Sequence, residues 1–289
     1  MSLKKMSLFD YVNYAFILLV SLLCLVPFFY LVSVSLTDVD VYIPYSFKLL
    51  PPRFSIDAYK YILGTSTFGN AIGSTTFITF VGTAISLAVT FPAAYTLTKR
   101  DIPFYGILSG MVVVFLVFSA GMIPTYLVVR GIKITNTYWA LMLPVATDSW
   151  SLIVVRSFMN SLPGEMEDSA KIDGCSDLGV FLRIIIPLSM ASIAAFALFF
   201  AVARWNTYFD ALIYITDTGK RTLQVLVKTM VIDNATYAAG AQSGWGDVVI
   251  PSEVLRSATI IVAVAPILIV YPFLQKYFVK GVMLGSIKG

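Results

Sequence analysis

A cluster of carboxylates is the part of this sequence whose chemistry is easiest to interpret. Glu165, Glu167, Asp168 and Asp173 fall within nine residues of the chain, between two long apolar stretches. Carboxylates at a surface accept charge-assisted hydrogen bonds from basic side chains and from backbone N–H groups. A chain that only spans a membrane has no need of such a segment. The cluster therefore predicts a surface that a soluble partner binds.

The residue types give little support to catalytic or metal chemistry. The chain contains no histidine, which removes the commonest general base and the commonest metal ligand. Its two cysteines, Cys24 and Cys175, are too few for a disulfide framework or for a zinc or iron–sulfur site. We therefore predict no catalytic residue, no metal site and no cofactor bound by this chain.

The residues around the carboxylates predict a helix, a sharp turn and a second helix over 161–183. Pro163 suits the start of a helix, and the acids that follow it complement the helix dipole. Gly174 predicts the stop, because glycine adopts the left-handed conformation that other residues resist. Ser176 is placed to cap the second helix, which runs through Phe181. The first helix is expected to lie across the membrane surface.

The composition is that of a membrane protein. Hydrophobic residues make up 58% of the chain and charged residues 12%, with a mean hydropathy of +0.85, whereas soluble proteins average about 25% charged residues. Windows of about 20 apolar residues predict an all-α polytopic membrane protein with six transmembrane helices in a single domain over 1–289. The expected spans are approximately 14–36, 70–97, 106–129, 138–159, 184–215 and 257–279. The net charge of +4 is spread along the chain and gives no nucleic-acid signal.

The basic residues predict the orientation. Lys4 and Lys5 precede the first apolar run. That run is long enough to span and lacks a small-x-small cleavage site, so we expect a retained helix rather than a signal peptide. Basic residues in the short loops place both termini, and the loop between spans four and five, in the cytoplasm. The long loops 37–69 and 216–256 then lie outside.

The spacing in the carboxylate segment resembles the EAA loop of permease subunits of ABC importers. That loop reads Glu-Ala-Ala, three residues, Gly, nine residues, and Ile-x-Leu-Pro. In this chain it stands as Asp168-Ser169-Ala170, three residues, Gly174, nine residues, and Ile184-Ile185-Ile186-Pro187. Two further stretches, 204–215 and 275–289, resemble the carbohydrate-importer, maltose-permease-like branch of the family. Within that branch the resemblance is to permeases for polysaccharides and oligosaccharides.

The resemblance implies a role for the segment and a set of partners. The family's loop is a coupling helix that docks in a cleft of an ATPase subunit, which implies docking roles in this chain for Glu165, Glu167, Asp168, Ser169, Ala170, Asp173 and Gly174. It also implies a second permease chain, two ATPase subunits that bind ATP and Mg, and an extracytoplasmic sugar-binding protein, at a bacterial cytoplasmic membrane. The chain itself has no G-x-x-x-x-G-K-[ST] loop. An oligosaccharide would pass by alternating access that the ATPase drives.

Polar and aromatic residues in the predicted spans are candidates to line a path for a sugar. Asn206 and Asp210 are four residues apart and should share one face of a helix. Sugars contact aromatic faces through C–H groups, and amides or carboxylates through hydroxyls. The candidate path residues are Asn206, Tyr208, Asp210, Trp205, Asp148 and Trp150. Packing, and the aromatic belt of a membrane interface, are the alternative explanation for the same residues.

Some alternatives stay open on the sequence alone. The chain could be a permease of the same family for a non-sugar solute, or an ion-coupled secondary transporter. The loop 216–256 is either a contact for the binding protein or a connector, and the tail 276–289 contacts either anionic lipid or the ATPase subunits. A membrane-embedded enzyme is disfavoured, because histidine is absent and the carboxylates gather in one loop.

Overall fold

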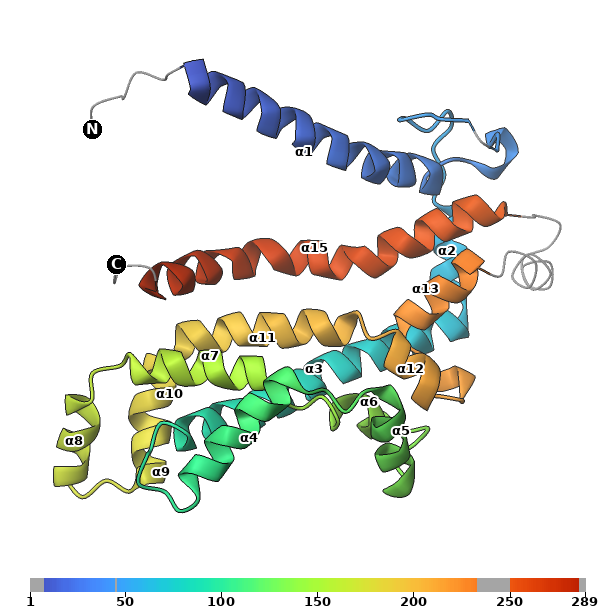
Figure 1. Cartoon of the computed structure of the whole chain (residues 1–289). Helices are drawn as coiled ribbons and strands as arrows, with labels where there is room; N and C mark the ends of the chain where they lie inside the picture. Colours follow the sequence, from blue (N-terminus) through green and yellow to red (C-terminus); the bar gives the residue numbers. More distant parts are fainter. Residues whose placement is uncertain (1–7, 45, 233–249, 286–289) are drawn as a thin grey trace. The chain divides into compact units, whose positions relative to one another are not determined.

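The computed structural model describes residues 8–44, 46–232 and 250–285 (Figure 1). Helices make up most of this part of the chain, and one isolated antiparallel bridge joins Thr37 and Phe54. The chain divides into two compact units: 1–69 with 227–265, and 70–226 with 266–289.

Helices of very different lengths follow one another along the chain. Up to residue 160 they are α1 (Leu8–Ser35), η1 (Val39–Val41), α2 (Asp57–Gly64), α3 (Ser66–Thr96), α4 (Tyr105–Val117), α5 (Met122–Gly131), α6 (Trp139–Met142) and α7 (Ser149–Asn160). Beyond it they are α8 (Glu165–Ile172), α9 (Asp177–Val180), η2 (Phe181–Ile185), α10 (Ile186–Leu188), α11 (Met190–Trp205), α12 (Phe209–Tyr214), η3 (Thr218–Lys220), α13 (Leu223–Ile232) and α15 (Ser252–Gly285).

The first unit contains a long apolar helix with few contacts of its own. The 28 residues of α1 include Pro27, and the most hydrophobic part of the helix is exposed in the structure. Its end is buried, where the hydroxyls of Ser35 and Tyr59 lie 2.7 Å apart. Beyond the helix, Arg53 and Asp38 form an ion pair of 3.2 Å. Apolar side chains that the unit leaves exposed in this way suit a helix surrounded by lipid or by another membrane chain.

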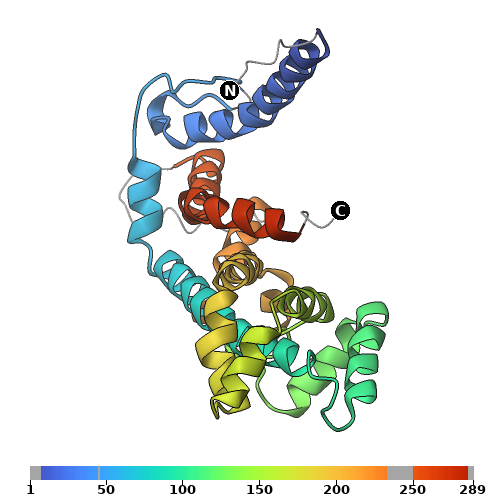
Figure 2. The ribbon, with the colours of Figure 1, turned by 90° about the vertical axis from the view of Figure 1, so that its left-hand side faces the viewer.

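Two hydrophobic clusters form the core of the second unit. The first gathers buried residues from the end of α3, from α7, from α9 and η2, and from α11: Phe91, Ala94, Tyr95, Leu152, Val155, Met159, Val180, Phe181, Ile185, Phe196 and Phe200. The second gathers Ile78, Val129, Ala140, Leu141, Met142, Ala211, Tyr214, Ile215 and Val225. Around the first cluster α7 packs against both α4 and α11, and α7 and α11 are neighbours in both views (Figures 1 and 2).

The membrane-spanning helices agree with the predicted architecture at a coarse level. Among the described residues, Leu8–Ser35, Ser66–Thr96 and Ser252–Val270 are long and apolar enough to cross a membrane. A bent pair, Asp177–Leu188 with Met190–Trp205, gives a fourth candidate if it counts as one span. The protein is therefore an all-helical polytopic membrane protein, with three to four candidate spans among the residues that the structure describes.

The other predicted spans are interrupted in the structure, and none of them is one continuous helix. The stretches 106–129, 138–159 and 184–215 are each built from two or more helices. Gly121 begins the second piece of the first stretch with φ +80°, a conformation that breaks a helix. In the second stretch Pro144 follows α6, and a proline cannot donate the hydrogen bond that would continue the helix. Hydropathy windows count apolar side chains and do not register these backbone breaks.

The bent pair has an identifiable cause. Pro187 lacks the N–H that a helix would direct at Arg183, and the turn before it, η2, is π-helical, with the Ile186 N–H bonded to the Phe181 carbonyl. Two residues after Pro187 the chain turns at the buried Ser189, and the two limbs differ in direction by 79°. A proline next to a π-turn is one of the usual origins of a sharp kink.

Candidate functional site

The carboxylate segment forms a helix, as predicted. Glu165, Glu167 and Asp168 occupy the first turn of α8, where the exposed N–H groups and the helix dipole favour negative charge. The Ser169 hydroxyl donates a hydrogen bond of 2.8 Å to the Glu165 carbonyl, so the Ser169 side chain is bonded to the backbone of its own helix. No side chain caps this helix, and Gly164 stands at its start.

The turn after α8 is a Schellman motif. Gly174 has φ +81°, and its N–H donates to the Lys171 carbonyl at 3.0 Å. The N–H of Cys175 reaches back to the Ala170 carbonyl at 2.9 Å, and Ala170 and Cys175 both pack against the first core cluster. These paired bonds and the apolar contact define the motif, which requires a left-handed residue at Gly174. The predicted helix stop is confirmed.

The second helix starts at the predicted cap. The Ser176 hydroxyl accepts a hydrogen bond of 3.2 Å from the Gly179 N–H at the start of α9. Gly179 lies close to Cys175, since a Cβ at this position would come within 2.6 Å of the Cys175 sulfur. An exposed ion pair of 3.0 Å joins Lys171 to Asp177 across the turn, and this hydrogen bond to Asp177 raises the pKa of Lys171.

One of the predicted docking carboxylates, Glu167, faces the rest of its own chain. Its carboxylate forms an ion pair with Lys99, which follows α3, and the side chains are 19% and 25% exposed. The Tyr95 hydroxyl donates to the same Glu167 oxygen at 3.5 Å, and the Lys99 ammonium lies 4.8 Å from the centroid of the Tyr95 ring. Burial lowers the pKa of Lys99, but the hydrogen bond and the charge of Glu167 outweigh burial, so that pKa is raised.

The other predicted docking residues present a different face. The side chains of Glu165, Asp168, Ser169 and Asp173 are exposed, as is Gly174, whereas Ala170 faces the core. Ile172 adds an apolar side chain that is 87% exposed between them. The surface therefore combines negative charge with one protruding aliphatic group. A basic cleft with an apolar floor would fit this chemistry.

The structure does not bring the candidate path residues onto one helix face. The expectation for Asn206 and Asp210 is wrong, because α11 ends at Trp205 and α12 begins at Phe209, with irregular backbone between them. Asn206 is the C-cap residue of α11, and its side-chain amide donates a hydrogen bond of 2.9 Å to the Val202 carbonyl in the last turn of that helix. Trp205 is buried, and the partly buried Tyr208 packs against the second core cluster.

Asp148 and Trp150 have structural contacts that explain their positions. Asp148 is the N-cap of α7 and accepts hydrogen bonds from the Ser151 N–H at 2.9 Å and from the Ser151 hydroxyl at 2.6 Å. The Trp150 ring lies 6.0 Å from the ring of Phe196 and 6.1 Å from that of Phe199. For these two residues the packing explanation accounts for the geometry.

Arg204 is buried, and the hydrogen bonds that the structure describes for its guanidinium go to a hydroxyl and a carbonyl rather than to an acid. Its guanidinium donates to the Ser86 hydroxyl at 2.9 Å and to the Val145 carbonyl, and thereby joins α11 to α3 and to the break after α6. Gly82 makes room for it, because a Cβ there would lie 3.1 Å from Arg204 Nε. Small residues on α3 and a lone arginine in α11 are too weak a signal to find such a contact from sequence.

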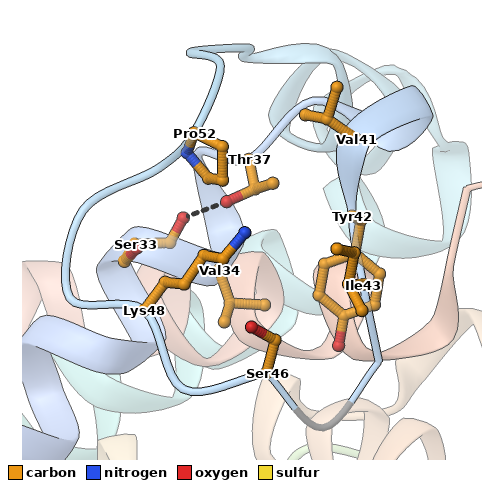
Figure 3. Close-up of a pocket in the computed structure, with 9 residues that line it drawn as sticks. All are labelled: Ser33, Val34, Thr37, Val41, Tyr42, Ile43, Ser46, Lys48 and Pro52. Atoms are coloured by element: carbon orange, nitrogen blue, oxygen red, sulfur yellow. Dashed lines mark hydrogen bonds between the residues drawn. The ribbon is translucent and has the colours of Figure 1, made fainter.

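A small pocket lies in the first unit, at the end of α1 and in the segment that follows it. It is lined by Ser33, Val34, Thr37, Val41, Tyr42, Ile43, Ser46, Lys48 and Pro52 (Figure 3). The Thr37 hydroxyl donates to the Ser33 carbonyl at 2.7 Å within it. None of the predicted docking or path residues lines this pocket.

Comparison with known proteins identifies the family to which this chain is similar. Residues 94–284 match the family described as binding-protein-dependent transport system inner membrane component. The polygalacturonan/rhamnogalacturonan transport system permease protein YtcP of Bacillus subtilis (strain 168) is 40% identical over 99% of this chain and 100% of its own length. Protein LplC of the same organism is 44% identical over 99% of this chain and 97% of its own.

A solved structure agrees over nearly the whole chain. It is the crystal structure of a bacterial ABC transporter involved in the import of the acidic polysaccharide alginate. One of its chains is similar to this protein with a TM-score of 0.87 and 28% sequence identity, over 96% of this chain and 100% of that one.

Proposed function

Because the chain belongs to the family of inner membrane components of binding-protein-dependent transport systems, we propose that it passes oligosaccharides or polysaccharides from an external binding protein into the cytoplasm. Its family makes it a non-catalytic, multi-pass permease of the inner membrane that works with a binding protein in an ABC transporter. Energy must then enter from other subunits. We place ATP and Mg on two ATPase subunits, and a second, related permease chain beside this one.

The proposed substrate class comes from the relatives and from the sequence motifs. One relative is named for polygalacturonan and rhamnogalacturonan, and the similar solved chain belongs to a transporter for alginate. Both names describe acidic polymers, so oligogalacturonate is the first substrate to test. A neutral oligosaccharide of the same length is the control for charge, and an amino acid is the control for solute class.

The observation that carries the energy-coupling part is the helix–turn–helix of α8 and α9. The Schellman turn at Gly174 gives it a fixed bend, and its exposed side carries Glu165, Asp168, Ser169 and Asp173 around Ile172. We place the ATPase subunit against this exposed side. A charge-assisted hydrogen bond contributes about 1.5–3 kcal/mol, so a few such bonds orient the helix while apolar contact at Ile172 adds affinity.

The proposed topology keeps six spans in one membrane domain over 1–289, with both termini and α8 in the cytoplasm. The broken stretches would then cross the membrane as two or more shorter helices each, which bundles accept where the irregular backbone faces protein or a water-filled cavity. On this view the candidates to meet substrate are Asn206 and Tyr208, in the break between α11 and α12, and Asp210, in the first turn of α12. Trp205, Asp148 and Trp150 would support them through packing and capping.

The test is co-purification of the tagged chain from its native membrane. Gly174→Ala places a Cβ on a residue with φ +81°, whereas Gly164→Ala places the same group at φ −64° in open space. The wild type and Gly164→Ala should recover an ATPase subunit and a second permease, and Gly174→Ala should recover less ATPase. If the wild-type chain comes out alone and moves solute into liposomes without ATP, an ion-coupled transporter replaces this proposal.

A further inference from the structure

Glu167 stands apart from the other carboxylates of α8 in what it contacts. Its neighbour in sequence, Asp168, is exposed, whereas the Glu167 side chain is 19% exposed and turned toward Lys99 and Tyr95. A carboxylate already engaged by a lysine and a tyrosine of its own chain is poorly placed to receive donors from another protein. Charge alone therefore does not make it part of the docking surface.

We propose that the Lys99–Glu167 ion pair is a clip that fastens the docking helix α8 to the cytoplasmic end of α3, so that displacement of α8 by its ATPase partner moves α3. The proposal rests on the proposed function of α8. It assigns Glu167 and Lys99 as positioning residues and leaves Glu165 and Asp168 to meet the partner. The clip joins residues 68 positions apart, and so couples a loop between later spans to an early one.

The surroundings of the pair make it a fixed contact rather than a solvated surface pair. The Lys99 ammonium lies over the Tyr95 ring, 4.8 Å from its centroid, which adds a cation–π contact. The Tyr95 ring in turn lies 5.1 Å from the ring of Phe181, the first residue of η2. Charges that are partly shielded from water are screened less by salt than exposed ones.

Tyr95 and Lys99 also determine what the clip can move. Tyr95 lies in the last turn of α3, a 31-residue helix that is one of the candidate membrane spans, and Lys99 follows three residues after its end. Tyr95 is 7% exposed and belongs to the core cluster that also holds residues of α7 and α11. A force applied to α8 therefore reaches α3 through the ion pair, and reaches α9 and η2 through the Gly174 turn.

The experiment uses the complete complex, reconstituted in liposomes with its ATPase subunits and the binding protein loaded with oligogalacturonate. Glu167→Gln and Lys99→Gln each remove one charge of the clip. Asp177→Asn is the matched control, because it breaks the exposed Lys171–Asp177 pair in the same segment. Three quantities are measured: the ATPase recovered with the tagged chain, the rate of ATP hydrolysis, and solute imported per ATP hydrolysed.

The expected result separates docking from coupling. Glu167→Gln and Lys99→Gln should recover the ATPase within about twofold of wild type, yet import at least about tenfold less solute per ATP. Asp177→Asn should match wild type in both. Exchanging the charges, with Lys99→Glu and Glu167→Lys together, should restore at least half of the lost coupling, which a merely structural role of either residue would not produce.

Other outcomes overturn the inference. Wild-type import per ATP in Glu167→Gln would show that the clip transmits nothing. Loss of ATPase recovery in Glu167→Gln, but not in Lys99→Gln, would show that Glu167 docks directly. If the single variants fail to reach the membrane, the charge-exchanged chain decides, and uncoupled hydrolysis there refutes the clip. Absence of ATPase from the wild-type preparation would instead refute the proposed function.

Discussion

Replacing Gly179 by alanine tests the packing of the turn between α8 and α9. The new Cβ would lie 2.6 Å from the sulfur of Cys175 and 3.3 Å from the hydroxyl oxygen of Ser176. Forcing an extra carbon into such a space costs about 1–3 kcal/mol, and the change from glycine to alanine in a helix returns about 1 kcal/mol. The expected net effect is a loss of about 0–2 kcal/mol in the local stability of α9.

A double-mutant cycle isolates the contact. In a Cys175→Ala background the sulfur is gone, so Gly179→Ala should become neutral or stabilising by up to about 1 kcal/mol. The two backgrounds should therefore differ by about 1–3 kcal/mol, the overpacking term alone. Ser176→Gly, which removes the more distant 3.3 Å oxygen, should relieve much less of the cost.

The assay is amide hydrogen exchange of residues 176–186 in the purified complex. When reclosing is fast, exchange rates report the free energy of local opening, and tenfold faster exchange corresponds to about 1.4 kcal/mol. Equal exchange in Gly179→Ala and wild type would refute the reasoning. So would a loss of stability that persists undiminished in the Cys175→Ala background.

Three further changes probe the same unit. Gly82→Ala should lower the thermal midpoint of the complex, because the new Cβ would lie 3.1 Å from Arg204 Nε. Gly73→Ala is the control and should leave the midpoint unchanged, since nothing lies within 4 Å of a Cβ there. Equal midpoints for the two variants would contradict the contact. Asp148→Ala removes the N-cap of α7 and should cost about 0.5–2 kcal/mol of local stability, seen as faster amide exchange at the start of that helix. The raised pKa of Lys99 means that its contribution to stability is complete below the ordinary lysine value of 10.5 and is lost as pH rises through the higher folded value. The difference in thermal midpoint between wild type and Lys99→Gln should accordingly hold constant from about pH 8 to 10 and shrink above that range, and a difference that shrinks below pH 9 would contradict the assignment.

The helix–turn–helix was predictable because its signals are local. Gly174 and Ser176 each act on backbone groups within five residues of themselves, through a left-handed turn and an N-cap. Such interactions depend on sequence spacing alone. The same holds for the dense acids in the first turn of α8. Contacts distant in sequence are not needed to form this turn and this cap.

The parts that escaped prediction depend on contacts distant in sequence or on backbone geometry. Glu167 contacts Lys99 rather than solvent because the chain after α3 brings Lys99 beside it. Lys99 is 68 positions earlier in the sequence, so this contact cannot be found from local spacing. The face shared by Asn206 and Asp210 exists only if the helix continues, and it stops at Trp205. Polar residues such as Asn206 and Thr207 lie at the break, but polar residues also occur inside helices, so composition alone does not locate it.

The kink at Ser189 determines the direction in which a force continues. The limb Asp177–Leu188 meets α11 at 79°. The cosine of that angle is about 0.19, so about one fifth of a push along the first limb acts along the axis of α11. The component across the axis is about 0.98 of the push, because it scales with the sine of the same angle, and it acts as a torque. If α8 lies in the cytoplasm, as we propose, its displacement would swing α11 sideways about the end at Ser189, much more than it would slide the helix through the bilayer. Probes for movement should therefore report tilt, with labels at the far end of α11, where a small rotation produces the largest displacement.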